Sequence, residues 1–467
     1  MTERATRVFT AEDQKWFAGA SGDWNPIHVD AIAARRTLVG EQVVHGMHAV
    51  IWALDCYWKA AGHSVFNHIS VSFPRPILLG QVVDLEWSSD EGTTRLFLTS
   101  QGEIHCAITC SIGALLELEM SLPRGRGLYT AARDRSFEEL KGVSGQTDVV
   151  MIGHQLNEVY ELASRGLGGL RLRALACLSR VVGMEVPGLH SLFSGLDVSM
   201  TDVEDTVFSY RVVRHKSVQQ PIKMSVSGGG IEGTVSAFFR PPPSKQLSFA
   251  DVQAEVPSDA FRDQTALVVG GSRGLGEMTA KVIAAGGGVP VLTYFHGAND
   301  AAQIASEIHA HGGQCYTSKL DVCNLDVGWA VLGQAGYRFS HLYYFATPHI
   351  GKQTASSFDS ERLRRFQEFY VDGFVRLSEL CAQQGQIRVF YPSTVFVDEV
   401  PEAMAEYVAA KTAGEKAAAR LNLGNPSLSV LMRRLPRLDT DQNLSVLGKP
   451  PEPPMQHVLS FVQEMSL

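Results

Sequence analysis

The sequence of 467 residues predicts an α+β fold, used twice, in the N-terminal part and an α/β fold with a doubly wound parallel sheet after it. The first prediction depends on an internal repeat, and the second on a regular alternation of strand-like and helix-like segments. Two polar segments, about 121–145 and 241–263, are expected to be linkers. They divide the chain into three expected domains, 1–120, 146–243 and 264–467.

The repeat consists of matching residues at a constant offset of 127 positions (190 − 63). The matched pairs are His63 and His190, Ser64 and Ser191, Phe66 and Phe193, Val71 and Val198, Ser72 and Ser199, Ser100 and Ser227, Gly102 and Gly229, and Ile104 and Ile231. In each copy an apolar segment of helix length precedes the matched run, at about 46–61 and 172–186, and alternating strand-like segments follow it. One long helix followed by several strands fits a hot-dog unit, in which an antiparallel sheet wraps a central helix. The repeat therefore predicts a double hot dog, with the second copy degenerate.

The third block repeats the order strand, helix, strand. Apolar β-prone runs alternate with helical patterns from residue 265 to the strand-like run at 387–394. Because βαβ units place helices on both faces of a parallel sheet, this block predicts a Rossmann-type domain.

Composition excludes several functional classes. The formal net charge is −8, which favours neither nucleic acid nor an anionic membrane surface as a partner. No apolar run is long enough to cross a bilayer, and the charged N-terminus is unlike a secretory signal. Seven cysteines without a CxxC pair indicate neither a disulfide framework nor a zinc site. We therefore expect a reducing, cytoplasmic setting.

One short segment of the first block carries the residue types of acid–base catalysis. Asp23 and His28 lie five residues apart, and Asn25-Pro26 turns the chain between them. The turn can direct a carboxylate and an imidazole into one cavity, where they can share a water molecule. Gly46 lies at the start of the helix expected downstream, where an unpaired backbone N–H and the helix dipole favour negative charge.

Residues 17–30 resemble the signature of MaoC-like hydratases and of the hydratase part of peroxisomal multifunctional enzymes. The resemblance continues through 43–48 and 73–80 and covers roughly the first 120 residues. It implies an R-specific enoyl-thioester hydratase in which Asp23 and His28 are the acid/base pair. It also implies that the Gly46 amide binds the developing oxyanion, and we expect Asn25 to fix the loop. An Asx-turn beside a surface histidine is the less favoured alternative.

The second copy lacks this motif, because the equivalent positions are Val150 and Gln155. We expect it to be architectural, to complete the sheet and to accommodate the acyl chain. Its three glycines, 228–230, predict a hairpin turn. In the first copy, four other histidines are expected to have structural roles, without a metal site: His45, His48, His63 and His68.

A glycine-rich run in the third block follows a strand and opens a helix. Gly270, Gly274 and Gly276 would let the backbone approach a pyrophosphate at a helix N-terminus. With Asp321-Val322 after the third strand and Tyr407 four residues before Lys411, the run resembles that of short-chain dehydrogenases. The coenzyme-binding residues implied are Gly270, Ser272, Arg273, Gly274, Leu275, Gly276, Asp321, Val322, Tyr407 and Lys411.

The same resemblance implies that Tyr407 passes a proton to a carbonyl, while Lys411 lowers the pKa of Tyr407 and holds the nicotinamide ribose. Ser393 or Thr394 would orient the substrate oxygen; the ungapped spacing favours Thr394 and the residue type favours Ser393. Three features depart from the family. Residues 344–347 read Tyr-Phe-Ala-Thr instead of Asn-Asn-Ala-Gly, Asp372 replaces an asparagine, and the segment after Lys411 is short.

The coenzyme expected is NADP(H) in preference to NAD(H). No acidic residue ends the second strand of the block, at 292–296, to hold a ribose 2′-hydroxyl. Arg273 could instead face a 2′-phosphate.

The two implied activities share an intermediate. A 3-oxoacyl thioester is reduced to a (3R)-hydroxyacyl thioester, which a hydratase interconverts with the trans-2-enoyl thioester. We therefore predict a bifunctional enzyme of fatty-acid or polyketide-type metabolism that acts on acyl chains on coenzyme A or an acyl carrier protein. A homodimer is also among the expectations. The alternatives are a hydratase with an inactive nucleotide-binding or docking module, and a scaffolding double hot dog.

Overall fold

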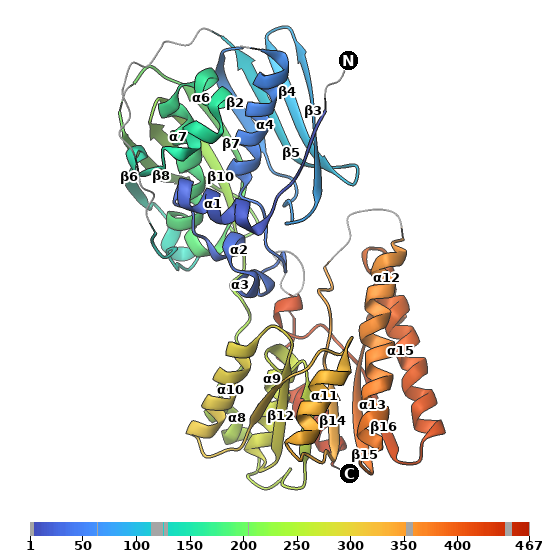
Figure 1. The fold of residues 1–467 in the computed structure, drawn as a ribbon. Helices are drawn as coiled ribbons and strands as arrows, with labels where there is room; N and C mark the ends of the chain where they lie inside the picture. The colour runs from blue at the N-terminus through green and yellow to red at the C-terminus, as the bar shows by residue number, and fades with distance from the viewer. Residues whose placement is uncertain are drawn as a thin grey trace. The chain divides into compact units, whose positions relative to one another are not determined.

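A computed structural model describes residues 4–62, 64–113, 125, 129–203, 205–351, 358–443 and 451–466. The chain forms two compact units, Met1–Pro242 and Pro243–Leu467. The first unit contains both copies of the repeat, and the second contains the alternating block (Figure 1).

An antiparallel sheet in the order β1-β3-β4-β5-β2-β7-β10-β9-β8-β6 forms the first unit. Its strands are β1 (Ala5–Val8), β2 (Phe66–Ser72), β3 (Val82–Asp90), β4 (Thr93–Ser100), β5 (Glu103–Ile112), β6 (Ser144–Asp148), β7 (Ser191–Met200), β8 (Val207–Arg214), β9 (Ile222–Gly228) and β10 (Ile231–Phe239). The order is symmetric about the central pair of β2 and β7, in which Ile69 lies opposite Val198. This arrangement confirms the repeat and the double hot dog.

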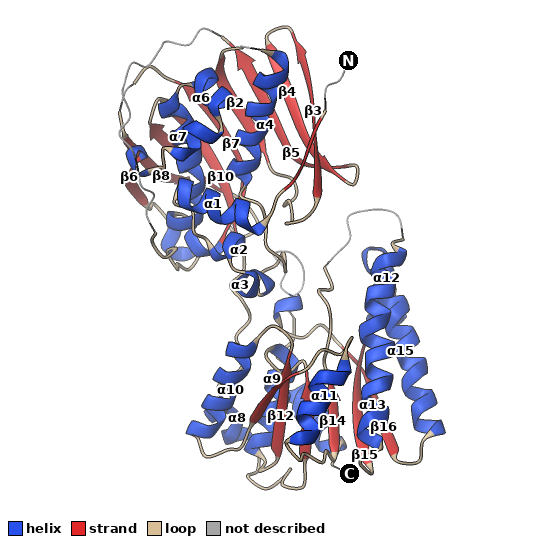
Figure 2. Cartoon of the chain, in the orientation of Figure 1, coloured by secondary structure: helices blue, strands red, loops and turns tan. Residues whose placement is uncertain are grey.

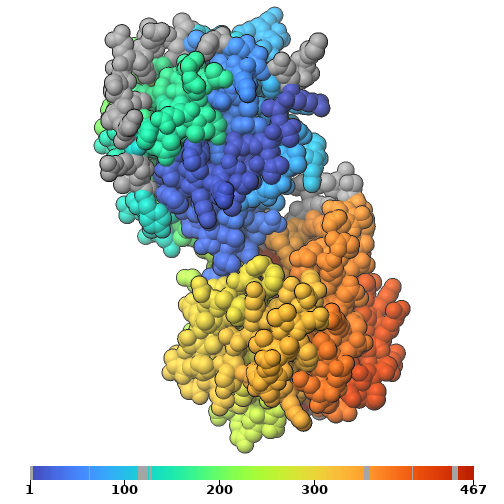
Figure 3. Space-filling model, viewed as in Figure 1, coloured from blue at the N-terminus to red at the C-terminus, as the bar shows by residue number. Residues whose placement is uncertain are grey.

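The central helices of the two copies lie against one face of this sheet (Figure 2). Helix α4 (Gly46–Ala61) has the predicted bounds, and the expected second helix is α7 (Gly169–Arg180), which continues as a π turn over Val181–Glu185. Both helices are buried over most of their length, and their apolar residues lie in one core with the inward-facing strand residues. In the space-filling view the first and second copies are in direct contact (Figure 3).

Short helices connect the first strand to this core. Helix α1 (Ala11–Ser21) begins at a capping box of Thr10 and Asp13 and ends at Gly22, whose φ of 74° is left-handed. Three further short helices follow it in the first unit, α2 (Pro26–Val29), α3 (Ala31–Arg35) and α5 (Gln155–Val159), and α6 (Glu161–Leu167) precedes α7. The three glycines 228–230 connect β9 to β10, which confirms the predicted hairpin.

Six parallel strands in the order β13-β12-β11-β14-β15-β16 form the sheet of the second unit. They are β11 (Thr265–Val269), β12 (Val289–Tyr294), β13 (Tyr316–Lys319), β14 (His341–Tyr344), β15 (Ile387–Thr394) and β16 (Leu428–Leu435). Alternate residues of β11 contribute to two separate cores, Ala266 and Val268 to one and Leu267 and Val269 to the other. Helices therefore cover both faces, as predicted for a doubly wound sheet.

The helices of this unit are α8 (Phe249–Glu255), α9 (Gly274–Ala285), α10 (Ala298–Ala310), α11 (Leu325–Gln334), α12 (Ser360–Gln367), α13 (Phe374–Ala382), α14 (Phe396–Glu399), α15 (Ala405–Gly424) and α16 (Met455–Glu464). Helix α8 lies inside the segment that we expected to be a linker. It forms because Ser248 caps it and because Phe249 and Val252 are buried in the core. A π turn, Glu368–Gly373, separates α12 from α13.

No helix among the described residues is long and apolar enough to span a membrane. All seven cysteines are free thiols.

Candidate active sites

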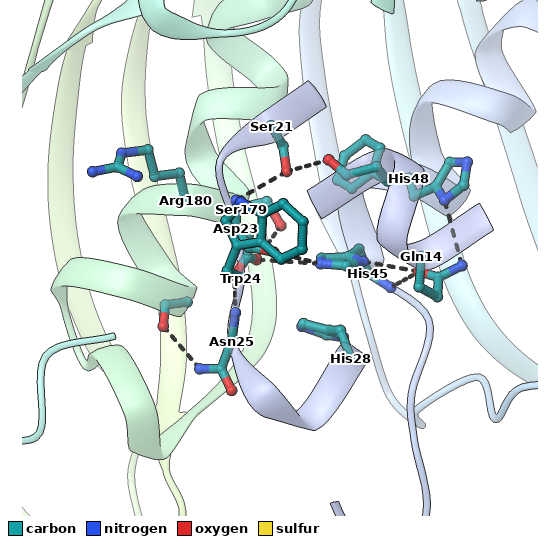
Figure 4. Close-up of polar contacts among 12 residues, drawn as sticks. Gln14, Ser21, Asp23, Trp24, Asn25, His28, His45, His48, Ser179 and Arg180 are labelled. Carbon is teal, nitrogen blue, oxygen red and sulfur yellow. Dashed lines mark hydrogen bonds and ion pairs between the residues drawn. The ribbon is translucent and has the colours of Figure 1, made fainter. Parts of the chain in front are cut away.

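The structure places Asp23 immediately after α1, where the left-handed Gly22 turns the chain inward. The side chain is 2% exposed. Its Oδ1 accepts the backbone N–H of Asn25 at 3.2 Å, and its Oδ2 accepts the hydroxyl of Ser179 at 2.6 Å (Figure 4). The carboxylate therefore has two hydrogen-bond donors, one from its own loop and one from the second copy.

His28 lies on the short helix α2 and faces the same space. Its Nδ1 lies 2.9 Å from the carbonyl oxygen of Val43, which can only accept, so Nδ1 carries the hydrogen and Nε2 keeps its lone pair. A carboxylate oxygen of Asp23 and a ring nitrogen of His28 lie within 4.8 Å of each other. One water molecule with two hydrogen bonds of about 2.8 Å can bridge such a gap.

Burial controls the charge of both groups. It raises the pKa of Asp23, while the nearby His28 and the Ser179 hydroxyl lower it. Burial also lowers the pKa of His28, and the Asp23 carboxylate opposes that shift. The imidazole is consequently neutral near pH 7 and can accept a proton.

A cavity opens beside this pair and has walls from both copies. Its lining residues are Asp23, Ile27, His28, Val43, Val44, Gly46, Ala49, Phe73, Pro74, Arg75, Pro76, Ile77, His105, Ser179, Val182, Gly183, Ser191, Leu192, Phe193, Ser194 and Phe238. Gly46 is the first residue of α4, so its N–H has no acceptor within the helix. A Cβ at Gly46 would lie 2.9 Å from the Phe73 ring, so a larger residue here would require that ring to shift.

Asn25 fixes the loop between the two candidate catalytic residues. Its Nδ2 donates to the carbonyl oxygens of Gly183 at 2.8 Å and Gly188 at 3.0 Å, and its Oδ1 accepts the Ile27 N–H at 3.2 Å. These contacts support the predicted role of Asn25, and they join the loop to the second copy.

The other histidines of the first copy have polar partners within the protein. His45 stacks on His28 at 3.8 Å between ring centres, and its ring nitrogens lie 2.8 Å from Gln14 Oε1 and 3.0 Å from the Asp23 carbonyl oxygen. A neutral ring has one N–H, so only one of these contacts is a hydrogen bond at a time. Asp23, His28 and His45 are close enough to share a metal ion, but both nitrogens of His45 already face oxygen atoms.

Two further histidines lie away from this cluster. His48 Nε2 contacts the Tyr160 hydroxyl at 2.7 Å, and His68 Nε2 contacts Asp197 at 3.1 Å. These contacts support structural roles, whereas His63 lies outside the described residues.

Sequence reasoning missed the contribution of the second copy. It has no Asp…His pair, but Ser179 contacts Asp23 directly and Arg180 donates to the Gly22 carbonyl oxygen at 3.1 Å. The second copy completes the sheet, as expected, and it also contributes a direct contact to Asp23 that the sequence did not indicate. The signal available was the adjacent Ser179 and Arg180 in the segment expected to be the second central helix.

In the second unit, the glycine-rich turn joins β11 to α9 at the point where strand order reverses. Gly270 has a φ of 74°, and a Cβ there would lie 2.9 Å from the backbone carbon of Phe345, after β14. A Cβ at Gly276 would lie 2.5 Å from the Gly270 carbonyl oxygen. Only glycines fit these two positions, so the turn has the shape that a coenzyme pyrophosphate requires.

The remaining residues predicted for the coenzyme lie along the same sheet edge. Ser272 and Leu275 belong to the glycine-rich segment, and Asp321-Val322 follow β13. The Asp321 carboxylate accepts the Cys323 N–H at 2.9 Å, which fixes this short turn.

Tyr407 and Lys411 lie on α15, but they have different neighbours. Tyr407 is hydrogen-bonded to the Thr394 side chain, whereas the Ser393 hydroxyl donates to Glu415 at 2.5 Å. The Lys411 ammonium donates to the Pro392 carbonyl oxygen at 2.7 Å. The geometry therefore favours Thr394 over Ser393 as the partner of Tyr407.

The expected lowering of the Tyr407 pKa by Lys411 is not found. Burial raises the pKa of Tyr407 to about 12, with the Thr394 hydrogen bond opposing the shift. Burial lowers the pKa of Lys411 to about 7, and the Glu415 carboxylate opposes that change. Lys411 lies over the Tyr370 ring at 4.1 Å, so its charge is directed toward β15 and Tyr370.

Arg273 contacts a residue that the sequence did not single out. Its Nη1 lies 3.2 Å from Asp441, and Thr440 lies 3.3 Å from the position of a Cβ at Gly274. The segment after β16 therefore lies against the glycine-rich turn, and Arg273 forms an ion pair there.

These two folds and their sites define a chain with a hydratase-type double hot dog and a Rossmann-type nucleotide-binding unit. Comparison with known families agrees: residues 1–105 match the MaoC-like domain, and residues 264–424 match the short chain dehydrogenase family. The chain thus carries a MaoC-like dehydratase domain at its N-terminus and a short-chain dehydrogenase domain at its C-terminus.

Three curated relatives cover parts of the chain. A mitochondrial 3-hydroxyacyl-[acyl-carrier-protein] dehydratase of Arabidopsis thaliana is 50% identical over 44 residues, 9% of this chain and 26% of that protein. A 3-hydroxybutyryl-CoA dehydratase of Methylorubrum extorquens is 26% identical over 115 residues, 24% of this chain and 70% of that protein. A 3-oxoacyl-[acyl-carrier-protein] reductase of Synechocystis sp. is 39% identical over 67 residues, 14% of this chain and 27% of that protein. The chain thus spans about a quarter of the length of the first and third relatives.

Proposed function

We propose that this protein is a bifunctional enzyme that interconverts 3-oxoacyl, (3R)-hydroxyacyl and trans-2-enoyl thioesters. The observation that carries the proposal is the buried pair of Asp23 and His28 beside a cavity, in a chain that also has a short-chain dehydrogenase domain. Reduction of the 3-oxo group and removal of water from the resulting alcohol are consecutive reactions on one acyl chain.

In the hydration direction, Asp23 and His28 Nε2 both accept hydrogen bonds from a water molecule held opposite C3. The water oxygen bonds to C3 as one of its protons passes to the pair, and the pair returns a proton to C2. The thioester oxygen gains negative charge during this addition, and the Gly46 N–H at the start of α4 is the donor that we assign to it. Dehydration follows the same steps in reverse.

For the reductase, the glycine-rich turn would hold the coenzyme pyrophosphate, with Ser272, Leu275 and Asp321-Val322 along the adjoining edge. A bound nicotinamide coenzyme supplies the hydride. Tyr407 then gives a proton to the substrate oxygen, and Thr394 orients that oxygen beside it. The absence of an acidic residue at the end of β12 favours NADP(H) over NAD(H). Arg273, which forms an ion pair with Asp441, is the residue that would face a 2′-phosphate.

One observation supports a hydratase whose second domain is an inactive nucleotide-binding or docking module. The Lys411 ammonium bonds to Pro392 and does not lower the pKa of Tyr407, so the reductase residues lack the electrostatic coupling expected of them. We retain this as the second candidate function.

The partners proposed are acyl thioesters on coenzyme A or on an acyl carrier protein, since the three relatives are named for both carriers. A cytoplasmic location and a homodimer remain predictions. Within one chain, the pairing of β2 with β7 already joins two hot-dog units, so the double hot dog does not depend on a second chain.

Two assays of the purified full-length protein test the proposal. Hydration of crotonyl-coenzyme A should be measured by loss of absorbance of the enoyl thioester, and reduction of acetoacetyl-coenzyme A by oxidation of NADPH. Both activities are expected. Hydration without reduction would favour the second candidate. Absence of hydration of crotonyl thioesters on both coenzyme A and an acyl carrier protein would contradict the hydratase assignment.

A further inference from the structure

The catalytic carboxylate of the first copy is held by the central helix of the second. Ser179, in the last turn of α7, donates its hydroxyl to Asp23 Oδ2 at 2.6 Å, and both side chains are buried (Figure 4). Ser179 also lines the cavity beside Asp23. The serine therefore contacts the carboxylate and also borders the cavity in which we propose that the reaction takes place.

The direction of this hydroxyl differs from that of two other buried serines in helices, Ser21 and Ser378. Ser21 and Ser378 donate to the carbonyl oxygens four residues earlier, Phe17 at 2.7 Å and Phe374 at 2.8 Å. That local bond is the common one for a serine in a helix. Ser179 instead donates across the junction of the two copies to a residue of another element.

The π turn after α7 is shaped around the same carboxylate. A Cβ at Gly183 would lie 2.2 Å from Asp23 Oδ1, so the carboxylate occupies the space where a side chain would be. The Trp24 N–H also lies 3.2 Å from the Met184 sulfur. The second copy thus fixes both the backbone and the side chain of the catalytic loop.

From these contacts we infer that Ser179 is a positioning residue of the hydratase, supplied by the second copy, which holds the Asp23 carboxylate toward the substrate cavity. The inference deepens the proposed hydratase function and depends on it. A hydroxyl suits this task because it stabilises the ionised carboxylate and fixes its rotamer without adding a charge. A buried cation in its place would hold the carboxylate too firmly in its ionised form for it to take up a proton.

Three variants of Ser179 test this role through hydration of crotonyl-coenzyme A. Ser179→Ala and Ser179→Cys remove the strong donor, and we expect kcat to fall about 10-fold or more while KM changes less than about 2-fold. Ser179→Thr keeps a hydroxyl and should recover most of kcat. Ser164→Ala is the matched control, because it removes a serine hydroxyl on α6 that accepts only a structural bond from Asn157.

The pH dependence separates positioning from a merely structural role. The Ser179 hydroxyl lowers the pKa of Asp23, so its removal raises that pKa, and the acid limb of the kcat profile should move to higher pH. Ser164→Ala should leave the limb in place. Unchanged kcat and pH profiles in Ser179→Ala and Ser179→Cys, with an active wild type, would overturn this inference alone. A wild type that hydrates neither a coenzyme A nor a carrier-protein thioester would overturn the proposed function, and the inference with it.

Discussion

At the scale of single residues, Asp23 and His28 carry the first prediction. Asp23→Asn and His28→Ala should each lower hydration by a factor of about 100 or more, because each removes a group that can take up a proton from the water that adds to C3. Reduction of acetoacetyl-coenzyme A should remain at the wild-type rate in both variants, which serves as the folding control. Normal hydration of several enoyl thioesters by Asp23→Asn would show that the site has been misassigned.

Arg273 and Tyr407 carry the second prediction, which concerns the coenzyme. Arg273→Ala should weaken NADPH binding more than NADH binding, because only NADPH offers a 2′-phosphate to the guanidinium. Tyr407→Phe should abolish reduction and leave coenzyme binding nearly intact. Fluorescence titration of both coenzymes measures binding, and the rate of NADPH oxidation with acetoacetyl-coenzyme A measures reduction. Tighter binding of NADH than of NADPH to the wild type would contradict the coenzyme preference, as would an Arg273→Ala protein that binds NADPH normally.

The proximity of Asp23 and His28 could be predicted because both residues lie within one short loop and have a recognisable spacing. Ser179 was not, since it lies 156 residues from Asp23 along the chain and is selected only by the packing of two helices. The direction in which a side chain points cannot be predicted from sequence spacing either. The four-residue spacing of Tyr407 and Lys411 places both on one helical face, but the amine of Lys411 extends to Pro392.

At the scale of elements, helix α4 had the predicted bounds because an apolar run ends clearly at Gly46 and Gly62. The helix α8 was missed because proline-rich sequence before it suggested a linker. Ser248 followed three residues later by Asp251 was an N-capping pattern that could have indicated it. The π turns after α7 and α12 have no comparable pattern in sequence, because tertiary contacts decide where a helix widens.

Helix α5 provides the third prediction. His154 and Glu158 are partly exposed and form a pair at 3.9 Å on its surface, away from the cavity lining. Replacing either by Ala should leave the hydration rate within about 2-fold of wild type, because surface ion pairs contribute little. The comparison with Ser179→Ala then distinguishes the surface of the second copy from the part that contacts Asp23. A large loss of hydration in His154→Ala would show that α5 also supports the site.

At the scale of the whole molecule, the two copies are expected to be inseparable. Deleting 146–243 would remove β7 from the centre of the ten-stranded sheet and expose the edge of β2. The truncated protein should be insoluble and inactive in hydration. Expression and sedimentation of the deletion variant measure this, and a soluble, active 1–120 fragment would contradict it.

Buried histidines give the hot-dog unit a predictable response to acid. Burial lowers the pKa of His48 to about 3, far below its ordinary value, so the unfolded chain takes up this proton first as the pH falls. Stability should therefore decrease between about pH 6.5 and pH 3, by up to about 1.4 kcal/mol per pH unit for one such group. Calorimetry at several pH values should show a smaller pH slope in His48→Gln than in the wild type. Equal slopes would mean that the pKa of His48 is the same in the folded and the unfolded protein.

Because the two copies belong to one chain, a substitution in one copy does not alter the sequence of the other. In a pair of identical subunits every substitution enters both halves, so a change that improves the support of one site also alters the other. In this chain the two copies differ at these positions. The residues of the first copy equivalent to Ser179 and Gly183, 127 positions earlier, are Trp52 and Cys56. The two halves can therefore diverge in sequence, and in the function that we propose the first supplies Asp23 and His28 while the second supplies Ser179, which holds Asp23.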